Sequence, residues 1–359
     1  MNNLKVGLIG CTGMANAYRN LYTQIDGAEL NYVVGLEVDN PKQIAEQLNC
    51  PNYSTDYMDC IKSDVDIVDI STPNHLHREQ FKEAVKAGKH VILQKPIAAS
   101  IEDAIDILQT SKETNKNVGM FMSRHASPIY REIKKMIDSG LIGKVTSIQA
   151  RTAIKKNSTP KPGGEEKNWR SSIEKTGGGS LIQLAVHDYD MIQWLLNEKI
   201  TEISCFSDNM MTPTVGGDDN SQTIFRTQSG VIGNVSSAYC SNGMIISIYG
   251  DKGIISYFVK KDTVTIISEN TYKSETVDYS TPGVEQEYKL NNVMYSVDNP
   301  YEQHVEFIKS IIDGKEVPVS IEDGFYSFMV VKAAYKSSTE NKTININEFI
   351  SEEINKVNK

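Results

Sequence analysis

The first 122 residues alternate between short hydrophobic runs and longer segments with helical periodicity. Short hydrophobic runs are typical of strands that are buried on both faces of a sheet. The predicted strands are Leu4–Gly10, Glu29–Leu36, Val65–Ser71, His90–Leu93 and Asn117–Met122. The predicted helices are Met14–Gln24, Lys42–Leu48, His77–Ala87 and Ile101–Asn115. This order predicts a parallel, doubly wound sheet that binds its ligand at the carboxyl ends of the strands.

After about Met122 the pattern changes to short strands in which hydrophobic and polar residues alternate. Such alternation indicates an open sheet with one face covered by helices and the other face free. The predicted strands are Val145–Thr152, Glu202–Ser207, Gln222–Arg226, Val231–Ser237, Met244–Tyr249 and Gly253–Val259. We therefore expect two domains, residues 1–122 and residues 123–359.

Composition narrows the classes of partner. The 359 residues allow two or three domains, and the net charge of −9 argues against nucleic acid and anionic membrane surfaces. No hydrophobic run approaches the roughly 20 residues that span a bilayer, and no signal-peptide region precedes the first strand. The five cysteines have no metal-ligand spacing, and their odd number fits free thiols in a reducing cytoplasm. The six histidines form no ligand cluster, so we expect no metal.

The turn after the first strand resembles a dinucleotide-binding fingerprint. It reads Gly10-Cys11-Thr12-Gly13-Met14-Ala15. Gly10 and Ala15 match the pattern G-x-G-x-x-G/A, whereas Thr12 replaces the middle glycine and Gly13 supplies flexibility one residue later. A pyrophosphate is expected on the N-terminus of the helix that follows. A plain glycine turn is the alternative.

Glu37 follows at the end of the second predicted strand. A carboxylate at this place accepts hydrogen bonds from the adenosine ribose. It also repels a 2′-phosphate, and Val38 offers no positive charge to bind one. The position therefore favours NAD over NADP, unless Glu37 is only a solvated acid in a loop.

Three glycines from position 177 precede Ser180, which is predicted to cap a helix that ends near Leu196. On that helix Gln183, His187 and Asp190 share one face. A titratable imidazole beside a glycine-rich approach suggests proton-transfer chemistry. The alternative is a buried histidine whose ring is paired with Asp190.

Two further polar stretches follow predicted strands. One is Ser71-Thr72-Pro73-Asn74-His75-Leu76-His77, and the other is Gln94-Lys95-Pro96. Because both lie at the carboxyl ends of strands, they are placed where a bound nicotinamide would extend.

In their order and spacing, these motifs resemble the Gfo/Idh/MocA family, which includes glucose–fructose oxidoreductase, inositol dehydrogenases and many sugar dehydrogenases. The resemblance covers nearly the whole chain, including residues 139–145 and a late segment from His304 to Gly324 that looks like the family's closing helices. It implies an N-terminal Rossmann domain and a C-terminal α/β domain with an open, largely antiparallel sheet. In similar proteins the free face of that sheet builds oligomers, so we expect a homodimer or a homotetramer.

The resemblance also implies roles for individual residues. Lys95 matches the lysine that reaches the reacting hydroxyl, and His187 matches the catalytic histidine; either could act as the base. Pro96 sets the turn that aims Lys95, and the peptide bond before it is either cis or trans. Gln183 is expected to orient the substrate or His187, so the expected catalytic residues are Lys95, His187 and Gln183.

Further residues are expected to bind the ligands. Arg124 matches the family's arginine after the fifth strand, and Trp169-Arg170 resembles its Trp-Arg pair near the cofactor, although packing between domains explains Trp169 equally well. The expected cofactor-binding residues are Gly10, Thr12, Gly13, Met14, Glu37, Thr72, Pro73, Asn74, His77, Gln94, Lys95, Arg124, Trp169 and Arg170. The expected substrate-binding residues are Lys95, His125, Gln183 and His187. The loop 155–167 is either part of a lid or an ordinary surface loop.

The chain departs from the family pattern at two carboxylates. Gln94 stands where a glutamate usually precedes the lysine, and Gln183 stands where an aspartate usually precedes the histidine. A glutamine keeps its hydrogen bonds but carries no charge. Because a nearby carboxylate favours the charged form of a lysine, we expect a lower pKa for Lys95 than in relatives that keep both acids.

The resemblance implies a cytoplasmic, NAD-dependent enzyme that oxidises a secondary hydroxyl of a sugar, a glycoside (at C3) or a cyclitol by hydride transfer. One alternative is a glycosidase that uses NAD to oxidise C3 transiently, with no net redox change. Another is a non-catalytic protein that binds NAD and a sugar. The expected partner is a small carbohydrate, with neither nucleic acid nor a membrane.

Overall fold

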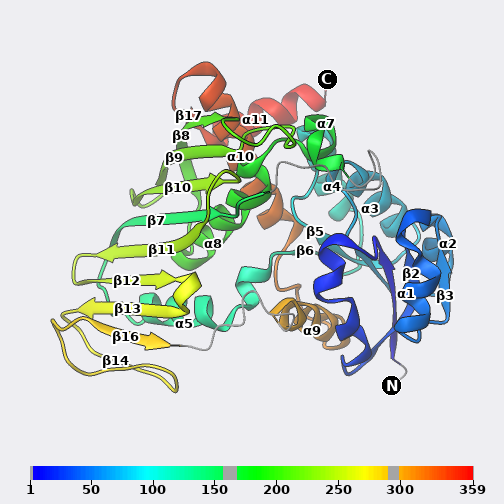
Figure 1. Cartoon of the computed structure of the whole chain (residues 1–359), viewed down its shortest axis with the longest axis horizontal. Coiled ribbons are helices and arrows are strands. Elements are labelled where there is room, and N and C mark those ends of the chain that lie inside the picture. Colours follow the sequence, from blue (N-terminus) through cyan, green and yellow to red (C-terminus); the bar gives the residue numbers. More distant parts are fainter. Residues whose placement is uncertain (1–2, 157–167, 290–298, 359) are drawn as a thin grey trace.

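Two β-sheets organise the chain (Figure 1). The computed structural model describes residues 3–156, 168–289 and 299–358, and within these residues the first sheet has six parallel strands in the order β3-β2-β1-β4-β5-β6. The second sheet has nine strands, in the order β16-β13-β12-β11-β7-β10-β9-β8-β17. The predicted fold class is confirmed: a doubly wound parallel sheet precedes a largely antiparallel one.

The first sheet is the nucleotide-binding type predicted from the sequence. Its strands are β1 Leu4–Ile9, β2 Ala28–Val34, β3 Asn52–Ser54, β4 Ile67–Ile70, β5 His90–Gln94 and β6 Val118–Phe121. Its α-helices are α1 Pro41–Gln47, α2 Tyr57–Lys62, α3 His77–Lys86 and α4 Ile101–Ser111. Every residue of β4 is buried, as expected of a strand covered on both faces. The strand order reverses between β1 and β4, and such a switch point is where doubly wound sheets bind dinucleotides.

The helix predicted at Met14–Gln24 is replaced by two short 3₁₀ helices, Gly13–Ala17 and Arg19–Thr23. Tyr18 separates them with a φ of −140°. Its hydroxyl donates to buried Asp69 of β4 at 3.2 Å, and the Tyr22 hydroxyl donates to the same carboxylate at 2.8 Å. These two bonds anchor the segment to β4 through its tyrosines, while the non-helical φ of Tyr18 interrupts a regular α-helix.

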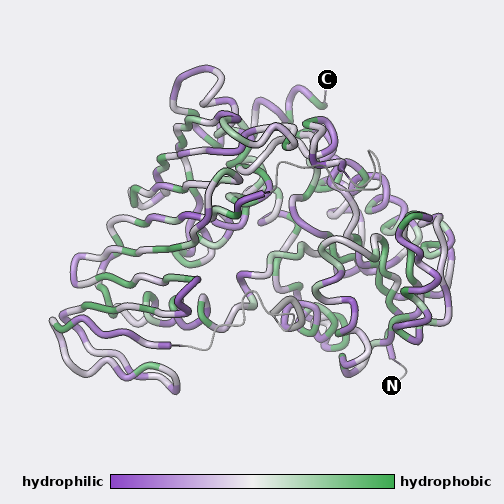
Figure 2. The backbone as a smooth tube through the Cα atoms, in the orientation of Figure 1, coloured by the Kyte–Doolittle hydropathy of each residue, from purple (hydrophilic) through white to green (hydrophobic). Residues whose placement is uncertain are grey.

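The second sheet is mixed, because β7 and β10 are parallel while its other neighbours are antiparallel. Its strands are β7 Val145–Ala153, β8 Ile200–Asp208, β9 Asn220–Thr227, β10 Ile232–Ala238, β11 Gly243–Gly250, β12 Gly253–Phe258, β13 Thr263–Ser268, β16 Gln286–Lys289 and β17 Ile344–Asn345. Buried and exposed residues alternate along β9, as a sheet with one free face requires. Figure 2 shows hydrophobic stretches along both sheets and hydrophilic ones along the outer loops.

Helices cover one face of the second sheet, on the side of the first sheet (Figure 1). The α-helices of this half are α5 Pro128–Asp138, α7 Ile173–Thr176, α8 Val186–Leu196, α10 Ile321–Glu340 and α11 Ile346–Val357. A small two-stranded sheet of β14 Tyr272–Lys273 and β15 Asp278–Tyr279 packs beside β13, where the buried Tyr279 hydroxyl donates to the Ser268 main-chain oxygen at 3.0 Å. The remaining 3₁₀ helices are Glu37–Asp39, Asn74–Leu76, Ser123–Ala126, Trp169–Ser171 and Val259–Lys261. None of the described helices has the length and hydrophobicity needed to cross a bilayer.

The chain returns to the first sheet through α9, Asn299–Ile312 (Figure 1). Phe307 and Ile308 are buried in the same hydrophobic cluster as Leu8 of β1. The Gln303 side-chain amide also donates to the main-chain oxygen of Met120 at 3.0 Å. A segment from the C-terminal part of the chain therefore completes the core of the nucleotide-binding half.

Candidate active site

Lys95 connects the two halves of the molecule. It directly follows β5, and the peptide bond between Lys95 and Pro96 is cis. The Lys95 ammonium donates to the main-chain oxygen of Gln183 at 3.0 Å. The lysine of the first half therefore lies against the segment that carries His187 in the second half.

His187 lies in the first turn of α8 and is half-buried. The turn before it, Leu181–Ala185, is π-helical, a conformation frequent at functional sites. Within the described residues the imidazole has no hydrogen-bond partner. The alternative of a histidine paired with Asp190 is wrong, because Asp190 binds the ring of His125 instead.

Asp218 holds the approach to this helix. Its carboxylate accepts the backbone N–H groups of Gly179 at 3.1 Å and Leu181 at 2.9 Å. Ser180, predicted to cap the helix, has helical backbone angles and donates its hydroxyl to Asp218 at 2.7 Å. The prediction for Ser180 is therefore wrong, because a carboxylate from a distant loop caps the helix in its place.

Burial and neighbouring positive charges set the protonation states of Lys95 and His187. Burial, followed by the charges of Arg170, Lys156 and Arg124, lowers the pKa of Lys95 to about 7. Burial, followed by the charges of Lys95 and Arg124, holds the pKa of His187 well below its usual value. His187 is therefore a neutral imidazole near pH 7, and Lys95 is balanced between its two protonation states.

Arg124 holds the residue next to His187 in place. Its buried guanidinium forms an ion pair with Asp188, the residue after His187, and donates to the Thr152 hydroxyl at 2.8 Å. Burial raises the pKa of Asp188. These contacts fix the start of α8 on β7, while the charge of Arg124 acts on both Lys95 and His187.

The turn after β1 fits a dinucleotide. Gly10 has a φ of +95°, and a Cβ there would lie 2.7 Å from the carbonyl carbon of Ser71, so the turn requires glycine. Thr12 donates its hydroxyl to Asp39 at 3.1 Å. The next two residues, Gly13 and Met14, are exposed beyond the end of β1. Glycine at positions 10 and 13 carries no side chain that would shield the backbone N–H groups of the turn from a phosphate.

Glu37 is exposed and begins the 3₁₀ helix after β2. Because β1 and β2 are parallel neighbours, Glu37 and the glycine turn share one edge of the sheet. The order of the strands, the turn and the acid together fit a nicotinamide dinucleotide, which supplies a hydride acceptor when bound.

The turn after β4 contributes structural ties. Thr72 donates its hydroxyl to Gln80 at 2.6 Å, and the buried Asn74 amide donates to the Thr176 main-chain oxygen at 2.8 Å. The half-buried Pro73 lies between them. The Asn74 bond is a second link between the two halves.

His77, expected to bind the cofactor, is fully buried. Its ring nitrogens lie 2.9 Å from the Thr72 oxygen and 3.0 Å from the Pro96 oxygen. Burial lowers the pKa of His77 to about 4. The structure therefore makes His77 a link between the turns after β4 and β5, out of reach of a ligand.

Two glutamine side chains retain unused donors. The Gln94 oxygen accepts the Lys95 backbone N–H at 3.0 Å. The Nε2 atoms of Gln94 and Gln183 are buried and have no hydrogen-bond partner within the described parts of the chain. Unpaired buried amides are costly, so these two, one from each half, fit a site that binds polar ligand groups.

Trp169 and Arg170 lie on the 3₁₀ helix Trp169–Ser171, and the Arg170 guanidinium stacks 4.2 Å from the Trp169 ring. The Arg170 side chain is exposed, and its charge acts on Lys95, so it lies beside the site. The predicted lid, residues 155–167, falls outside the described residues from position 157 onward.

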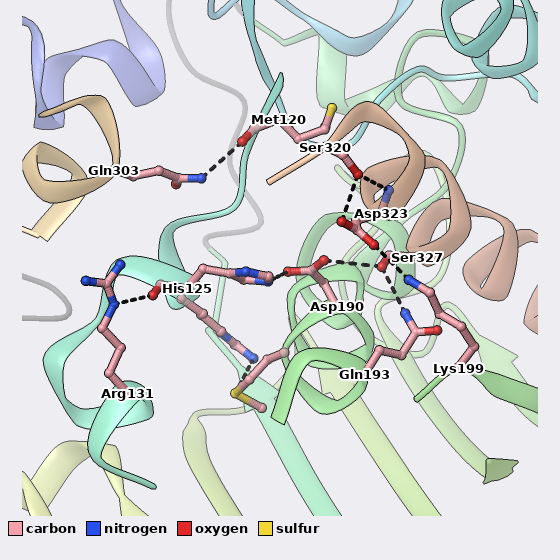
Figure 3. Close-up of polar contacts among 12 residues, drawn as sticks. Met120, His125, Arg131, Asp190, Gln193, Lys199, Gln303, Ser320, Asp323 and Ser327 are labelled. Atoms are coloured by element: carbon pink, nitrogen blue, oxygen red, sulfur yellow. Dashed lines mark hydrogen bonds and ion pairs between the residues drawn. The ribbon is translucent and has the colours of Figure 1, made fainter. Parts of the chain in front are cut away.

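His125 points toward Asp190 of α8 and belongs to a network of polar side chains (Figure 3). Its Nε2 lies 2.7 Å from the Asp190 carboxylate, and its ring stacks on Trp194 at 4.9 Å. Asp190 also accepts the Ser327 hydroxyl at 3.4 Å. His125, Asp190 and Trp194 border a cavity of about 240 Å³ that Lys199 also lines. The structure thus does not bring His125 to the residues with which it was expected to bind substrate.

The sequence did not single out Lys156, Asp188 or Asp218. Lys156 lies in the loop 155–167 but was not named by itself, and Asp218 is far from the motifs along the chain and is brought close only by the fold. Asp188 adjoins His187, but its role depends on an ion pair with Arg124, which is distant from it along the chain. A paired Asp218-Asp219 after two glycines was the only local signal.

Comparison with known proteins agrees with this geometry. Residues 4–122 match the profile "Oxidoreductase family, NAD-binding Rossmann fold", and residues 134–346 match "Oxidoreductase family, C-terminal alpha/beta domain", both of the Gfo/Idh/MocA type. Myo-inositol 2-dehydrogenase from Thermotoga maritima is 23% identical over 97% of this chain and 100% of the relative. The 2,7-anhydro-N-acetylneuraminate hydratase of Mediterraneibacter gnavus is 24% identical over 98% of this chain and 99% of the relative.

A solved structure has the same fold. Levoglucosan dehydrogenase in complex with NADH and L-sorbose superposes with a TM-score of 0.83, over 96% of this chain and 99% of that chain, at 22% identity. The likeness extends over both sheets.

Proposed function

Because the chain belongs to the Gfo/Idh/MocA oxidoreductase family, we propose that it oxidises a secondary hydroxyl of a sugar, a glycoside or a cyclitol by hydride transfer to NAD. The observation that carries the proposal is the meeting of Lys95 and His187 from opposite halves, beside a nucleotide-binding sheet edge. Relatives named for inositol and levoglucosan support this class of substrate.

The two residues have complementary roles. Neutral His187 accepts the proton of the substrate hydroxyl, and the Lys95 ammonium donates a hydrogen bond to the oxygen on which negative charge develops. The carbon-bound hydrogen leaves with its electron pair to the nicotinamide, which yields a ketone and NADH. The free amides of Gln94 and Gln183 orient the ligands on either side.

We infer NAD rather than NADP from Glu37. A carboxylate at the end of β2 accepts the ribose hydroxyls and repels a 2′-phosphate. The neighbouring Val38 is exposed and uncharged.

A second candidate is transient oxidation at C3 that eliminates a leaving group, after which the hydride returns. The relative named 2,7-anhydro-N-acetylneuraminate hydratase favours it, because its name describes no net oxidation. The same Lys95 and His187 serve both reactions, since each begins with loss of the hydroxyl proton and a hydride.

A substrate panel tests the proposal. Myo-inositol, levoglucosan, free aldoses and alkyl glucosides are each incubated with NAD, and both NADH and the carbon products are followed. Accumulation of NADH with an equal amount of ketone is the expected result. Cleavage or hydration of a substrate without NADH would favour the second candidate. A protein that binds NAD but changes none of these substrates would overturn both.

We also propose that a second copy of the chain covers the free face of the second sheet. Phe206, Ile224 and Ile232 are 78%, 62% and 47% exposed. They line a groove of about 490 Å³ on β8, β9 and β10. Exposed hydrophobic side chains gathered on one face are typical of an interface between subunits.

We expect Phe206→Glu to shift the protein towards the monomer, because each interface would bury a charge at its hydrophobic centre. Light scattering after gel filtration measures the change. Val357→Glu, which alters an exposed hydrophobic residue at the end of α11, is the control and should leave the molar mass unchanged. A monomeric wild type would contradict the proposal.

We propose a cytoplasmic location. All five cysteines are free in the structure, and four of them are buried. Free thiols and an NAD-dependent reaction both suit a reducing compartment.

A further inference from the structure

Lys332 of α10 contacts both segments that carry the proposed catalytic pair. Its ammonium donates to the main-chain oxygen of Ala99 at 2.8 Å and to that of Gly177 at 2.9 Å. Ala99 lies on the loop that leads away from Lys95 and cis-Pro96. Gly177 opens the turn that leads to Gln183 and His187.

The two segments touch at the place where Lys332 binds. A Cβ on Gly177 would lie 2.2 Å from the Ala99 oxygen, so only a glycine allows this approach. Two carbonyl oxygens converging on one point repel each other unless a donor lies between them. An ammonium with three N–H groups on a flexible stem suits this position.

The bonds to these two oxygens are the main polar contacts of Lys332. In the described parts of the chain it forms no ion pair, and its nitrogen lies 5.1 Å from the centre of the Phe328 ring. Burial lowers the pKa of Lys332 to about 8, against the opposing charge of Glu102. It is therefore charged at neutral pH, at a cost in desolvation that a surface lysine does not bear.

The next turn of α10 holds the other end of the glycine turn. The Tyr335 hydroxyl donates to Asp218 at 2.5 Å and accepts the Gly179 backbone N–H at 3.1 Å. One helix thus fixes the segment before His187 at two points, and through Lys332 it also holds the loop after Lys95.

We propose that Lys332 is a positioning residue that sets the separation of Lys95 and His187 by bridging the loop after Lys95 to the turn before His187. The inference rests on the proposed function, because it concerns the same two groups. Lys332 touches neither substrate nor cofactor in this role. It acts through the main chain of its neighbours.

Lys332→Met keeps the length of the side chain and removes both hydrogen bonds. We expect kcat to fall by about 10- to 100-fold, because a displacement of roughly 1 Å at reacting groups has effects of this size. The KM for substrate and the Kd for NAD should change by less than about threefold, since the binding groups remain. Lys332→Arg retains the charge and the donors, and should recover most of the lost activity.

Lys336→Met is the matched control, because Lys336 lies one turn later on the same helix and pairs with Glu352 near the surface at 3.4 Å. It should leave kcat unchanged. Thermal unfolding of all variants shows which of them are folded. If Lys332→Met does not fold, Lys332→Gln, which keeps a donor for one of the two oxygens, takes its place in the comparison.

A second readout needs no substrate. The rate of acetylation of Lys95 at different pH values, measured by peptide mass spectrometry, reports the pKa of Lys95 directly. We expect this pKa to change in Lys332→Met and to return in Lys332→Arg, because the ammonium of Lys95 would lose its place against Gln183. If Lys332 had only a structural role, the Lys332→Met variant would have a lower melting temperature but the wild-type pKa at Lys95.

The two readouts separate the hypotheses. If wild type oxidises no member of the panel, the proposed function fails, and the acetylation profile still decides the role of Lys332. If the folded Lys332→Met variant keeps both its kcat and the wild-type pKa of Lys95, the bridge has no influence on the site and the inference is overturned.

Discussion

Lys95→Met should lower kcat by about 10²- to 10⁴-fold, the range by which a positioned proton-transfer or charge-stabilising group accelerates a reaction. Methionine fills the volume of the lysine but supplies neither charge nor a donor to the substrate oxygen. The Kd for NAD should stay within about threefold, because the glycine turn and Glu37, which we propose as the site for the distant end of the dinucleotide, are unchanged. Steady-state kinetics and an NAD titration measure the two effects.

Lys86→Met is the control for this variant. Lys86 ends α3 in the same half and is exposed, with an ion pair to Glu83 at 3.2 Å. Its loss should change neither kcat nor Kd, since exposed ion pairs contribute little. If Lys95→Met retained more than about a tenth of the wild-type kcat, the proposed centre of the reaction would be misplaced.

Gln183→Asp should move the alkaline limb of the pH profile upward. Lys95 has a pKa of about 7, so the wild-type enzyme should lose activity above neutral pH as the ammonium loses its proton. A carboxylate at position 183 favours the charged lysine, and an opposite charge within about 4–6 Å raises a lysine pKa by roughly 1–3 units. The limb in kcat/KM should therefore shift by about the same amount.

Gln183→Asn separates charge from shape in this experiment, because asparagine has the size of aspartate without its charge. It should keep the wild-type limb. An alkaline limb that is the same in Gln183→Asp as in Gln183→Asn would show that Lys95 does not control the pH dependence. His187 is not expected to titrate in this range, since its pKa lies well below the usual value.

Strands with a strong hydrophobic pattern were predictable from the sequence. The last four residues of β1 and all of β4 are buried, whereas buried and exposed residues alternate along β9. The bounds of these three strands differ little from those predicted. The short strand β3 was missed, because two of its three residues are exposed and give no pattern. The helix predicted at Met14–Gln24 was wrong, because the backbone leaves helical angles at Tyr18, where φ is −140°.

At the site, the motifs identified Lys95 and His187 but not their surroundings. The strand pattern placed Lys95 just after β5, as observed, whereas His187 was expected inside a helix that begins near Ser180 and lies instead in the first turn of α8. Contacts between distant segments decide the rest, and neither spacing nor periodicity encodes them. The Asp190 carboxylate could pair with a histidine on its own helix or with one from elsewhere, and the fold selects His125.

The return of α9 to the first sheet has a consequence during synthesis. Phe307 and Ile308 are each at most 3% exposed in a cluster that otherwise comes from the nucleotide-binding half. When the ribosome has released only the first 122 residues, that hydrophobic surface has no cover. The nucleotide-binding half is synthesised first, but its hydrophobic core is completed only after α9 has been synthesised, when most of the chain has left the ribosome.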